Sequence, residues 1–334
     1  MDTVGLTAEY NPFHSGHEQQ LALIRKEAGQ ASGIVVCLSG PFCQRGGPAL
    51  LDKGVRAGLA IRMGADLVLE LPQAFAFSSA ERFAEGAVRT LLSTGIVRQL
   101  AYGTEDPLSH SLIRETAALL AQEPAELSAR LRQGIADGLG FAKAREEALA
   151  DYSQNPRMAR LLRNSNTILA VEYEKALARY GPLPTMALPL FDKEIISASL
   201  IRDRIQEARD SREPDALWQL MQDLATLLPP ASLALIMDAL TRKSGLVTEE
   251  DLALSLLLSP AFSRRESLAA MEGMQGGLAG RLFNELKNDP ARALGQGPFP
   301  YEALIRRLAS RTQPASRIRL INIICLIIYY SLYI

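Results

Sequence analysis

Short apolar runs alternate with amphipathic stretches along the first hundred residues. Four runs have the length and the aliphatic or β-branched content of buried strands, at residues 3–8, 33–38, 66–71 and 99–102. Between them apolar residues recur at helical spacing, which predicts helices at 16–28, 52–63 and 79–92, with Asp52 and Ser79 as N-caps. This alternation predicts βαβ units and a Rossmann-like parallel sheet, that is, an α/β fold.

The rest of the chain is predicted to be mainly helical. Residues 108–163 and 166–179 have helical character, 181–189 form a proline-rich connector or a last strand, and 197–208 form a helix. Strand-like runs stop near residue 212. We therefore predict an α/β domain over 1–212 with a helical insertion at about 108–180, followed by a helical C-terminal domain over 213–334.

Composition narrows the compartment more than the function. The net charge of −1 neither requires nor excludes nucleic acid. The three cysteines, Cys37, Cys43 and Cys325, suit neither a zinc site nor a disulfide framework, which favours a reducing cytoplasm. The N-terminus has no basic stretch, so we expect no signal peptide.

The last 15 residues, 320–334, are almost wholly apolar. A helix needs roughly 20 residues to span a bilayer, so this tail is too short for one. We expect a buried helix or strand and no membrane. An anchor for a membrane or a partner is the alternative.

Two of the three histidines, His14 and His17, lie in one tetrapeptide between the first predicted strand and the first predicted helix. A helix N-terminus offers unpaired N–H groups and partial positive charge to a phosphate. Gly16 allows close backbone approach, and two imidazoles can donate hydrogen bonds to phosphoryl oxygens. We predict a phosphate site here. The alternatives are a cap with a surface residue, or metal binding, although no acidic or cysteine ligand stands nearby.

A second group of polar residues begins the helix predicted at 197–208. Ser197 and Ser199 add hydroxyl donors to its N-terminal N–H groups, and Arg202 lies one turn further on. The planar guanidinium of arginine suits a polyphosphate. We predict phosphate binding by these three residues. An ordinary serine-capped amphipathic helix is the alternative.

The string EYNPFHSGH, Glu9 to His17, resembles the HxGH signature of the nucleotidyltransferase superfamily. In full it is similar to the corresponding segment of the bacterial tRNA(Met) cytidine acetate ligases. Other segments extend this resemblance over residues 3–205: SGPFCQRGGPA at 39–49, GADLVLELP at 64–72, YGTE at 102–105, SNTILAVEY at 165–173 and ISASLIR at 196–202. Lys53 matches a lysine that follows the first of these segments.

The resemblance implies an ATP-dependent acetate ligase. Such an enzyme forms acetyl-adenylate and acetylates N4 of the wobble cytidine of elongator tRNA(Met), with Mg²⁺ beside the ATP. His14 and His17 would be catalytic. The implied ATP contacts are Thr7, Ala8, Glu9, Tyr10, Asn11, Pro12, Phe13, His14, Ser15, Gly16, His17, Glu18, Gln19, Gln20, Gly103 and Asn166.

The chain departs from the family's pattern in two places. The family has a KRxGAxYH-like stretch with a nucleotide-binding arginine, whereas residues 186–195 (MALPLFDKEI) have no arginine. Lys193 supplies charge there but not a bidentate fork. The family also usually continues beyond its arginine-rich element, so we expect a shortened C-terminal domain.

Basic residues outside these motifs are candidates for RNA contact. Arg45 and Lys53 follow the second predicted strand, where they could meet tRNA or acetate. Arg306, Arg307 and Arg311 belong to a run without acidic residues between 303 and 319. Such a run suits a phosphate backbone. A solvated loop and a solvated helix face are the respective alternatives.

Three functions remain open on the sequence. The first is the acetate ligase that acts on tRNA. The second is an adenylyl- or cytidylyltransferase that makes a small metabolite, because the HxGH and serine motifs alone permit it. The third is a non-catalytic RNA-binding relative, which the absent arginine stretch would permit.

Overall fold

The structure is a computed structural model, and it describes residues 2–191, 196–242, 244–252, 277–288 and 301–309, with the single positions 266, 269, 274 and 318. Lys193, Arg311 and the apolar tail at 320–334 lie outside the described residues. In the described ranges, no helix is long and apolar enough to cross a membrane.

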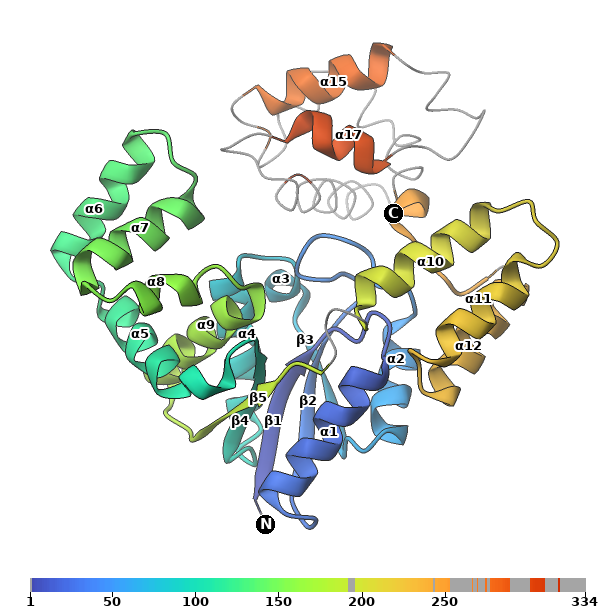
Figure 1. The fold of residues 1–334 in the computed structure, drawn as a ribbon, viewed down its shortest axis with the longest axis horizontal. Coiled ribbons are helices and arrows are strands. Elements are labelled where there is room, and N and C mark those ends of the chain that lie inside the picture. Colours follow the sequence, from blue (N-terminus) through green and yellow to red (C-terminus); the bar gives the residue numbers. More distant parts are fainter. Residues whose placement is uncertain are drawn as a thin grey trace.

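Five strands form one parallel sheet in the described part of the chain (Figure 1). Its order is β3-β2-β1-β4-β5. The strands are β1 (Thr3–Ala8), β2 (Gly33–Ser39), β3 (Leu67–Leu71), β4 (Gln99–Thr104) and β5 (Thr185–Pro189). The predicted α/β class is therefore confirmed, and the proline-rich segment contains the last strand.

Helices connect and flank these strands. Those that follow the first three strands and β4 are α1 (Ser15–Ala28), α2 (Lys53–Arg62), α3 (Gln73–Ala76), α4 (Ala80–Ser93), the 3₁₀ turn η1 (Pro107–Ser109) and α5 (His110–Gln122). The inserted helices are α6 (Ala125–Ala136), α7 (Phe141–Ser153), α8 (Pro156–Leu161) and α9 (Ser165–Tyr180). Beyond β5 lie α10 (Ala198–Asp210), α11 (Ala216–Ala225), α12 (Pro230–Arg242), α15 (Leu278–Asn288) and α17 (Tyr301–Leu308).

Two helices begin where the sequence predicts, because a side chain caps each of them. The Asp52 carboxylate accepts a hydrogen bond from Gly54 N at the start of α2, and Ser79 Oγ accepts one from Arg82 N at the start of α4. Each side chain satisfies an N–H that the helix itself leaves unpaired. The short helix α3 was not predicted, because four residues after a proline show no periodicity.

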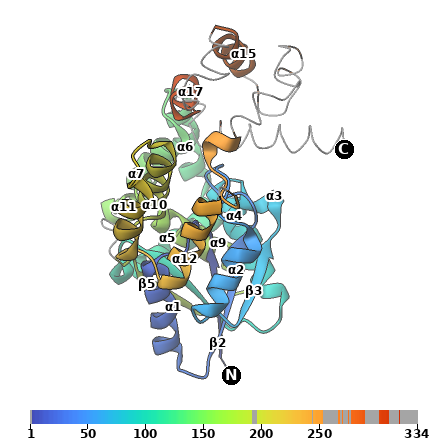
Figure 2. The same ribbon diagram turned by 90° about the vertical axis from the view of Figure 1, so that its right-hand side faces the viewer.

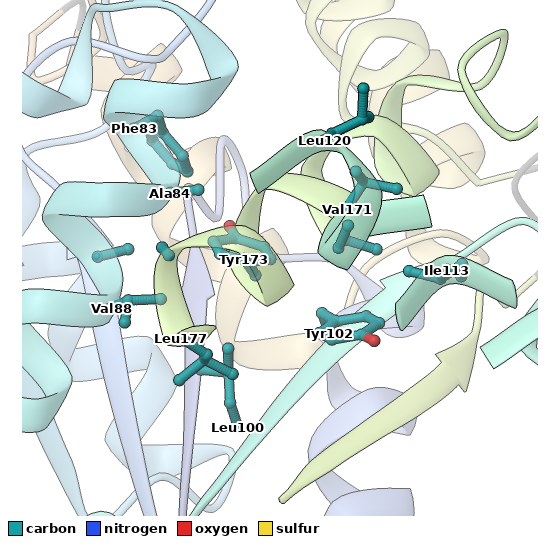
Figure 3. Packing of buried hydrophobic residues seen from close by; sticks show 14 of the residues in the cluster. Phe83, Ala84, Val88, Leu100, Tyr102, Ile113, Leu120, Val171, Tyr173 and Leu177 are labelled. Atoms are coloured by element: carbon teal, nitrogen blue, oxygen red, sulfur yellow. The ribbon is translucent and has the colours of Figure 1, made fainter. Parts of the chain in front are cut away.

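Helices cover both faces of the sheet. Successive residues of a strand point to opposite sides, so each strand contributes side chains to two cores. Val35 and Cys37 face a core built with α4, α5 and α9, whereas Ile34 and Val36 face a core built with α1 and α2. Figure 3 shows the first of these cores, where Tyr173 of α9 lies among residues from α4 and β4. The sheet is thus buried on both sides, as a doubly wound α/β domain requires.

A third apolar cluster joins the C-terminal helices to the sheet domain. Ile201 of α10, Leu220 of α11 and Ile236 of α12 pack with Leu50 and Leu51 from the loop after β2. In both views α12 lies beside α2 (Figures 1 and 2). The C-terminal helices therefore contact loops at the carboxyl edge of the sheet. The division at residue 212 stays a prediction.

Candidate functional site

The HxGH segment lies at the carboxyl end of β1, where parallel sheets carry their ligand sites. Tyr10 has a φ of 46°, a left-handed backbone conformation that is uncommon for residues other than glycine and asparagine. The rings of Tyr10 and Phe13 are fully buried and pack against His17, at centroid distances of 4.9 and 5.5 Å. The chain therefore turns sharply here, and buried aromatic rings hold its second histidine.

The two histidine rings form a stacked pair at the start of α1. Their centroids are 3.6 Å apart and their planes are inclined by 20°. A Cβ at Gly16 would lie 3.2 Å from two atoms of the His14 ring and 3.4 Å from the carbonyl oxygen of Phe191. Because any side chain at this position would crowd the ring, the glycine between the histidines permits the stack.

Both histidines are neutral near pH 7. Burial lowers the pKa of His14 to about 4, and burial together with the charge of His14 holds the pKa of His17 well below 6.5. His17 Nδ1 accepts a hydrogen bond from His14 N at 3.2 Å. A neutral imidazole whose Nδ1 accepts must carry its proton on Nε2. His17 therefore has an Nε2–H donor available, and an anion at this site would favour protonation of either ring.

Asn11 fastens the loop after β2 to this segment. Its amide oxygen accepts a hydrogen bond from Leu50 N at 2.7 Å, and its Nδ2 donates to Cys43 Sγ and to Pro48 O. Glu9 Oε1 accepts another from Gln44 N at 2.6 Å. The Asn11 side chain is thus committed to the protein, so a ligand would meet this residue through its backbone.

Arg56 of α2 is a site residue that the sequence interpretation missed. Its guanidinium is fully buried and donates to four carbonyl oxygens, those of Glu9, Ser39, Gly40 and Leu51. Three of the four acceptors lie just at or beyond the ends of β1 and β2. The signal for it was available, since Arg56 shares the buried face of α2 with residues three and four positions later.

The C-terminal helices also contact the HxGH segment. Ser15 donates from both its backbone N, at 3.0 Å, and its Oγ, at 2.8 Å, to the carbonyl oxygen of Leu227. Arg202 Nη1 donates to the carbonyl oxygen of Asn11 at 2.7 Å. Hence the structure brings Arg202 of the second predicted motif against the first one. Both donors of Ser15, its backbone N–H and its hydroxyl, are thus hydrogen-bonded to the protein.

The two serines of the second motif lie at the start of α10. Ser197 caps the helix by accepting from Leu200 N at 3.2 Å, and its Oγ lies 3.3 Å from Ser199 Oγ. Ser199 is exposed. The arrangement fits both interpretations of this motif, a capped helix and a set of phosphate donors.

On the other side of β1, the end of β4 contributes Gly103. A Cβ there would lie 2.8 Å from Leu190 Cδ2, just after β5, and 3.4 Å from Gln20 Nε2 of α1, so any other residue would require the Leu190 side chain to shift. Asn166, in the first turn of α9, donates through Nδ2 to Glu105 Oε1 at 2.9 Å. Gly103, Gln20 and Asn166 thus belong to the β4 side of the sheet edge.

The remaining predicted residues take different positions. Thr7 and Ala8 end β1, Pro12 is buried, and Glu18 and Gln19 are exposed on α1. Of the predicted RNA contacts, Arg45 is exposed, Lys53 pairs with Glu70 at 2.6 Å, Arg306 is exposed, and Arg307 pairs with Glu285 at 2.7 Å. Within the described ranges, no group of three or more His, Cys, Asp or Glu side chains could hold a metal ion.

Comparison with known proteins defines the class of this fold and site. The family model described as HIGH Nucleotidyl Transferase matches residues 1–329, and the chain belongs to that class. A tRNA(Met) cytidine acetate ligase of Clostridium kluyveri is 33% identical over 297 residues, which are 86% of this chain and 71% of the relative. The corresponding ligase of Clostridium novyi is 30% identical over 302 residues, with the same two shares.

A solved structure agrees with these relatives. The crystal structure of Thermotoga maritima TmcAL bound with alpha-thio ATP has a TM-score of 0.81 at 30% identity, and the match covers 98% of this chain and 75% of that one. The chain therefore belongs to the tRNA(Met) cytidine acetate ligase family, a ligase family of the nucleotidyltransferase superfamily. The family that the sequence motifs indicated is confirmed.

Proposed function

We propose that this enzyme binds ATP at the carboxyl edge of its sheet and uses it to activate acetate. A carboxylate oxygen of acetate attacks the α-phosphorus, the bond from that phosphorus to the bridging oxygen of pyrophosphate breaks, and acetyl-adenylate forms. The observation that carries this proposal is the stacked His14–His17 pair, held beside the N-terminus of α1. The family membership of the chain and the nucleotide in the related crystal structure support it.

The histidines would act by electrostatic stabilisation. His17 Nε2–H can donate to an oxygen of the α-phosphoryl group as negative charge grows on it, and the buried setting strengthens that interaction. His14 can take up a proton or donate beside it. Because the attacking group is the substrate carboxylate, the protein needs to supply no nucleophile, and its contribution is positioning and charge stabilisation.

The polyphosphate would lie toward Arg202, Ser197 and Ser199. Arg202 already reaches the HxGH backbone, so its guanidinium brings positive charge to the side of β1 that adjoins the loop after β2. Mg²⁺ would bind chiefly to phosphate oxygens and water, as it does beside nucleotides in general.

The acetyl group would then pass to tRNA. N4 of a cytidine attacks the acetyl carbonyl carbon, the bond to the AMP oxygen breaks, and N4 loses a proton. We propose the wobble cytidine of elongator tRNA(Met) as the acceptor, on the strength of the relatives' names. The exposed Arg45, and Arg306 with Arg307 on α17, are the proposed contacts to the tRNA backbone, together with Lys53 and Arg311. The cytoplasm stays the predicted compartment.

One assay separates the functions that the sequence left open. The purified chain is incubated with ATP, Mg²⁺, labelled acetate and tRNA, and the digested tRNA is analysed for N4-acetylcytidine. Label in this nucleoside is the expected result. Pyrophosphate release without labelled tRNA would indicate a small-metabolite nucleotidyltransferase instead. Bound tRNA without ATP turnover would indicate a non-catalytic RNA-binding protein.

The role of the site itself is tested with His17→Ala. We expect acetate-dependent pyrophosphate release to fall by about 100- to 1,000-fold, the usual effect of removing one donor to a developing oxyanion. His110→Ala is the matched control, because His110 hydrogen-bonds to Thr185 on a different part of the sheet. We expect this control to keep wild-type turnover. Full ATP turnover by His17→Ala would refute the assignment of the histidine pair.

A further inference from the structure

The β4 side of the site contains a carboxylate, Glu105, which ends the YGTE segment and has no part in the proposed chemistry. It lies directly after β4 and reaches the first turn of α9. Its Oε1 accepts from Asn166 Nδ2 at 2.9 Å and from Asn166 N at 3.4 Å, and its Oε2 accepts from Thr167 N at 2.9 Å and from Thr167 Oγ1 at 2.8 Å. One side chain thus receives four donors from two consecutive residues.

The hydrogen bonds around Glu105 have a single consistent direction. The Thr167 hydroxyl gives its one proton to the carboxylate, so in its 2.9 Å contact with Thr104 Oγ1 it must accept. Thr104 and Thr167 are both fully buried. The carboxylate also places negative charge at the N-terminus of α9, where the helix dipole favours it and where Asn164 provides no side-chain cap. Glu105 is therefore held in one orientation.

This orientation fixes the Asn166 carboxamide. A carboxylate can only accept, so the Nδ2 end of Asn166 must face Glu105 and a flipped amide would set two oxygens against each other. Oδ1 of Asn166 and its second N–H are then left for a ligand. Within the described ranges no protein group hydrogen-bonds to Oδ1.

The position of Asn166 favours the nucleoside over the phosphates. Arg202 contacts the HxGH segment beside the loop after β2, so the proposed polyphosphate lies on that side of β1. The strand on the opposite side of β1 is β4, which leads into Glu105. A carboxylate there repels phosphate, whereas a neutral base tolerates it. Asn166 is therefore placed to meet the base.

We propose that Glu105 is a positioning residue that sets the base preference of the enzyme through Asn166. This inference rests on the proposed binding of ATP. A carboxamide with a fixed acceptor and donor matches adenine, which offers an amino donor beside a ring-nitrogen acceptor. The O6/N7 edge of guanine presents two acceptors and does not match this pair. Because Glu105 prevents the amide from flipping, it excludes the arrangement that would accept the O6/N7 edge of guanine.

The test compares the binding of ATP and GTP, with Mg²⁺ but without acetate or tRNA, by calorimetry. In Glu105→Gln the new amide can donate or accept, so Asn166 can flip. We expect ATP affinity to fall about tenfold and the ratio of ATP to GTP affinity to fall by at least as much. Asn166→Ala should lower ATP affinity similarly, and the double variant should be no weaker than Asn166→Ala alone.

Two further variants separate positioning from stability. Thr167→Val removes a donor to the same carboxylate but leaves Asn166 in place, so we expect a lower melting temperature and an unchanged ATP/GTP ratio. Glu105→Asp keeps the charge but withdraws it by one methylene, and we expect an intermediate loss of discrimination. Glu105→Asp also serves if Glu105→Gln does not fold.

The outcomes distinguish this inference from the proposed function. If the wild-type chain does not bind ATP, the proposed function fails. If the wild type binds ATP but neither Glu105 variant changes the ATP/GTP ratio, the inference about Glu105 is overturned while ATP binding stands. Additive losses in the double variant, or unchanged ATP affinity in Asn166→Ala, would overturn it as well.

Discussion

The two sides of the candidate site are organised by opposite charges. On the β2 side, Arg56 and Arg202 donate to backbone carbonyls of the HxGH segment and of the adjacent loops. On the β4 side, Glu105 accepts from the backbone and side chains at the start of α9. Cationic groups thus support the side proposed for the polyphosphate, and a carboxylate supports the side proposed for the base.

The two sides also differ in how far their contacts reach along the chain. Glu105 binds residues 61 and 62 positions away and draws on two elements, β4 and α9. The β2 side combines β1, the loop after β2, α2, α10 and the Leu227 carbonyl before α12. This difference indicates that the histidine pair depends on the C-terminal helices, whereas the β4 side depends only on the sheet domain.

The largest expected effect on stability is that of Arg56→Met. Four carbonyl oxygens, three of them in buried residues, would lose their donor, and we expect the free energy of unfolding to fall by about 3 kcal/mol. Urea denaturation measures this change. Arg56→Lys keeps the positive charge but not the planar guanidinium, so its free energy of unfolding should lie between those of the wild type and Arg56→Met. If Arg56→Met lowers the free energy of unfolding no more than Glu105→Gln does, the contrast between the two sides is wrong.

A comparable effect, spread over the acidic range between the two pKa values of His14, is expected from pH. The pKa of His14 is about 4 in the folded chain and near 6.5 when unfolded, so between these values the unfolded chain binds more protons. Stability should therefore be lost as pH falls from 6.5 toward 4, by up to about 1.4 kcal/mol per pH unit for this group. His14→Gln should flatten the slope in denaturation curves measured across this window. An unchanged slope would contradict the assigned burial.

The smallest expected effect is that of Ser15→Ala. The variant loses the 2.8 Å hydrogen bond from Ser15 Oγ to Leu227 O but keeps the one from the backbone N. We expect a loss of about 1 kcal/mol in stability and faster amide exchange around residue 227. The ATP/GTP affinity ratio should not change, since it belongs to the β4 side. A changed ratio would show that the two sides are not independent.

Much of the sheet domain was predictable because its signals are local. Every strand expected before residue 105 is present, and the helices predicted between these strands begin and end within two residues of their expected bounds. Buried strands and capped amphipathic helices are specified by residues that are neighbours in sequence. The HxGH segment was recognisable for the same reason, since its histidines and glycine lie within four residues.

Contacts between distant residues were not predictable in this way. The sequence predicts Arg56 only as part of the helix at 52–63, and Glu105 only as part of the YGTE segment. Their roles depend on which carbonyls and which helix end lie opposite them. For Asn11 the sequence motif indicated a ligand contact, whereas its side chain binds residues 43, 48 and 50.

The sequence by itself determined the α/β class, the family and the position of the histidine pair, because local periodicity and short motifs carry that information. Only the tertiary structure decided that the histidines stack and are neutral, that Arg56 joins the ends of β1 and β2, and that Glu105 orients Asn166. Burial and hydrogen-bond direction arise when distant segments meet, and no local pattern encodes them.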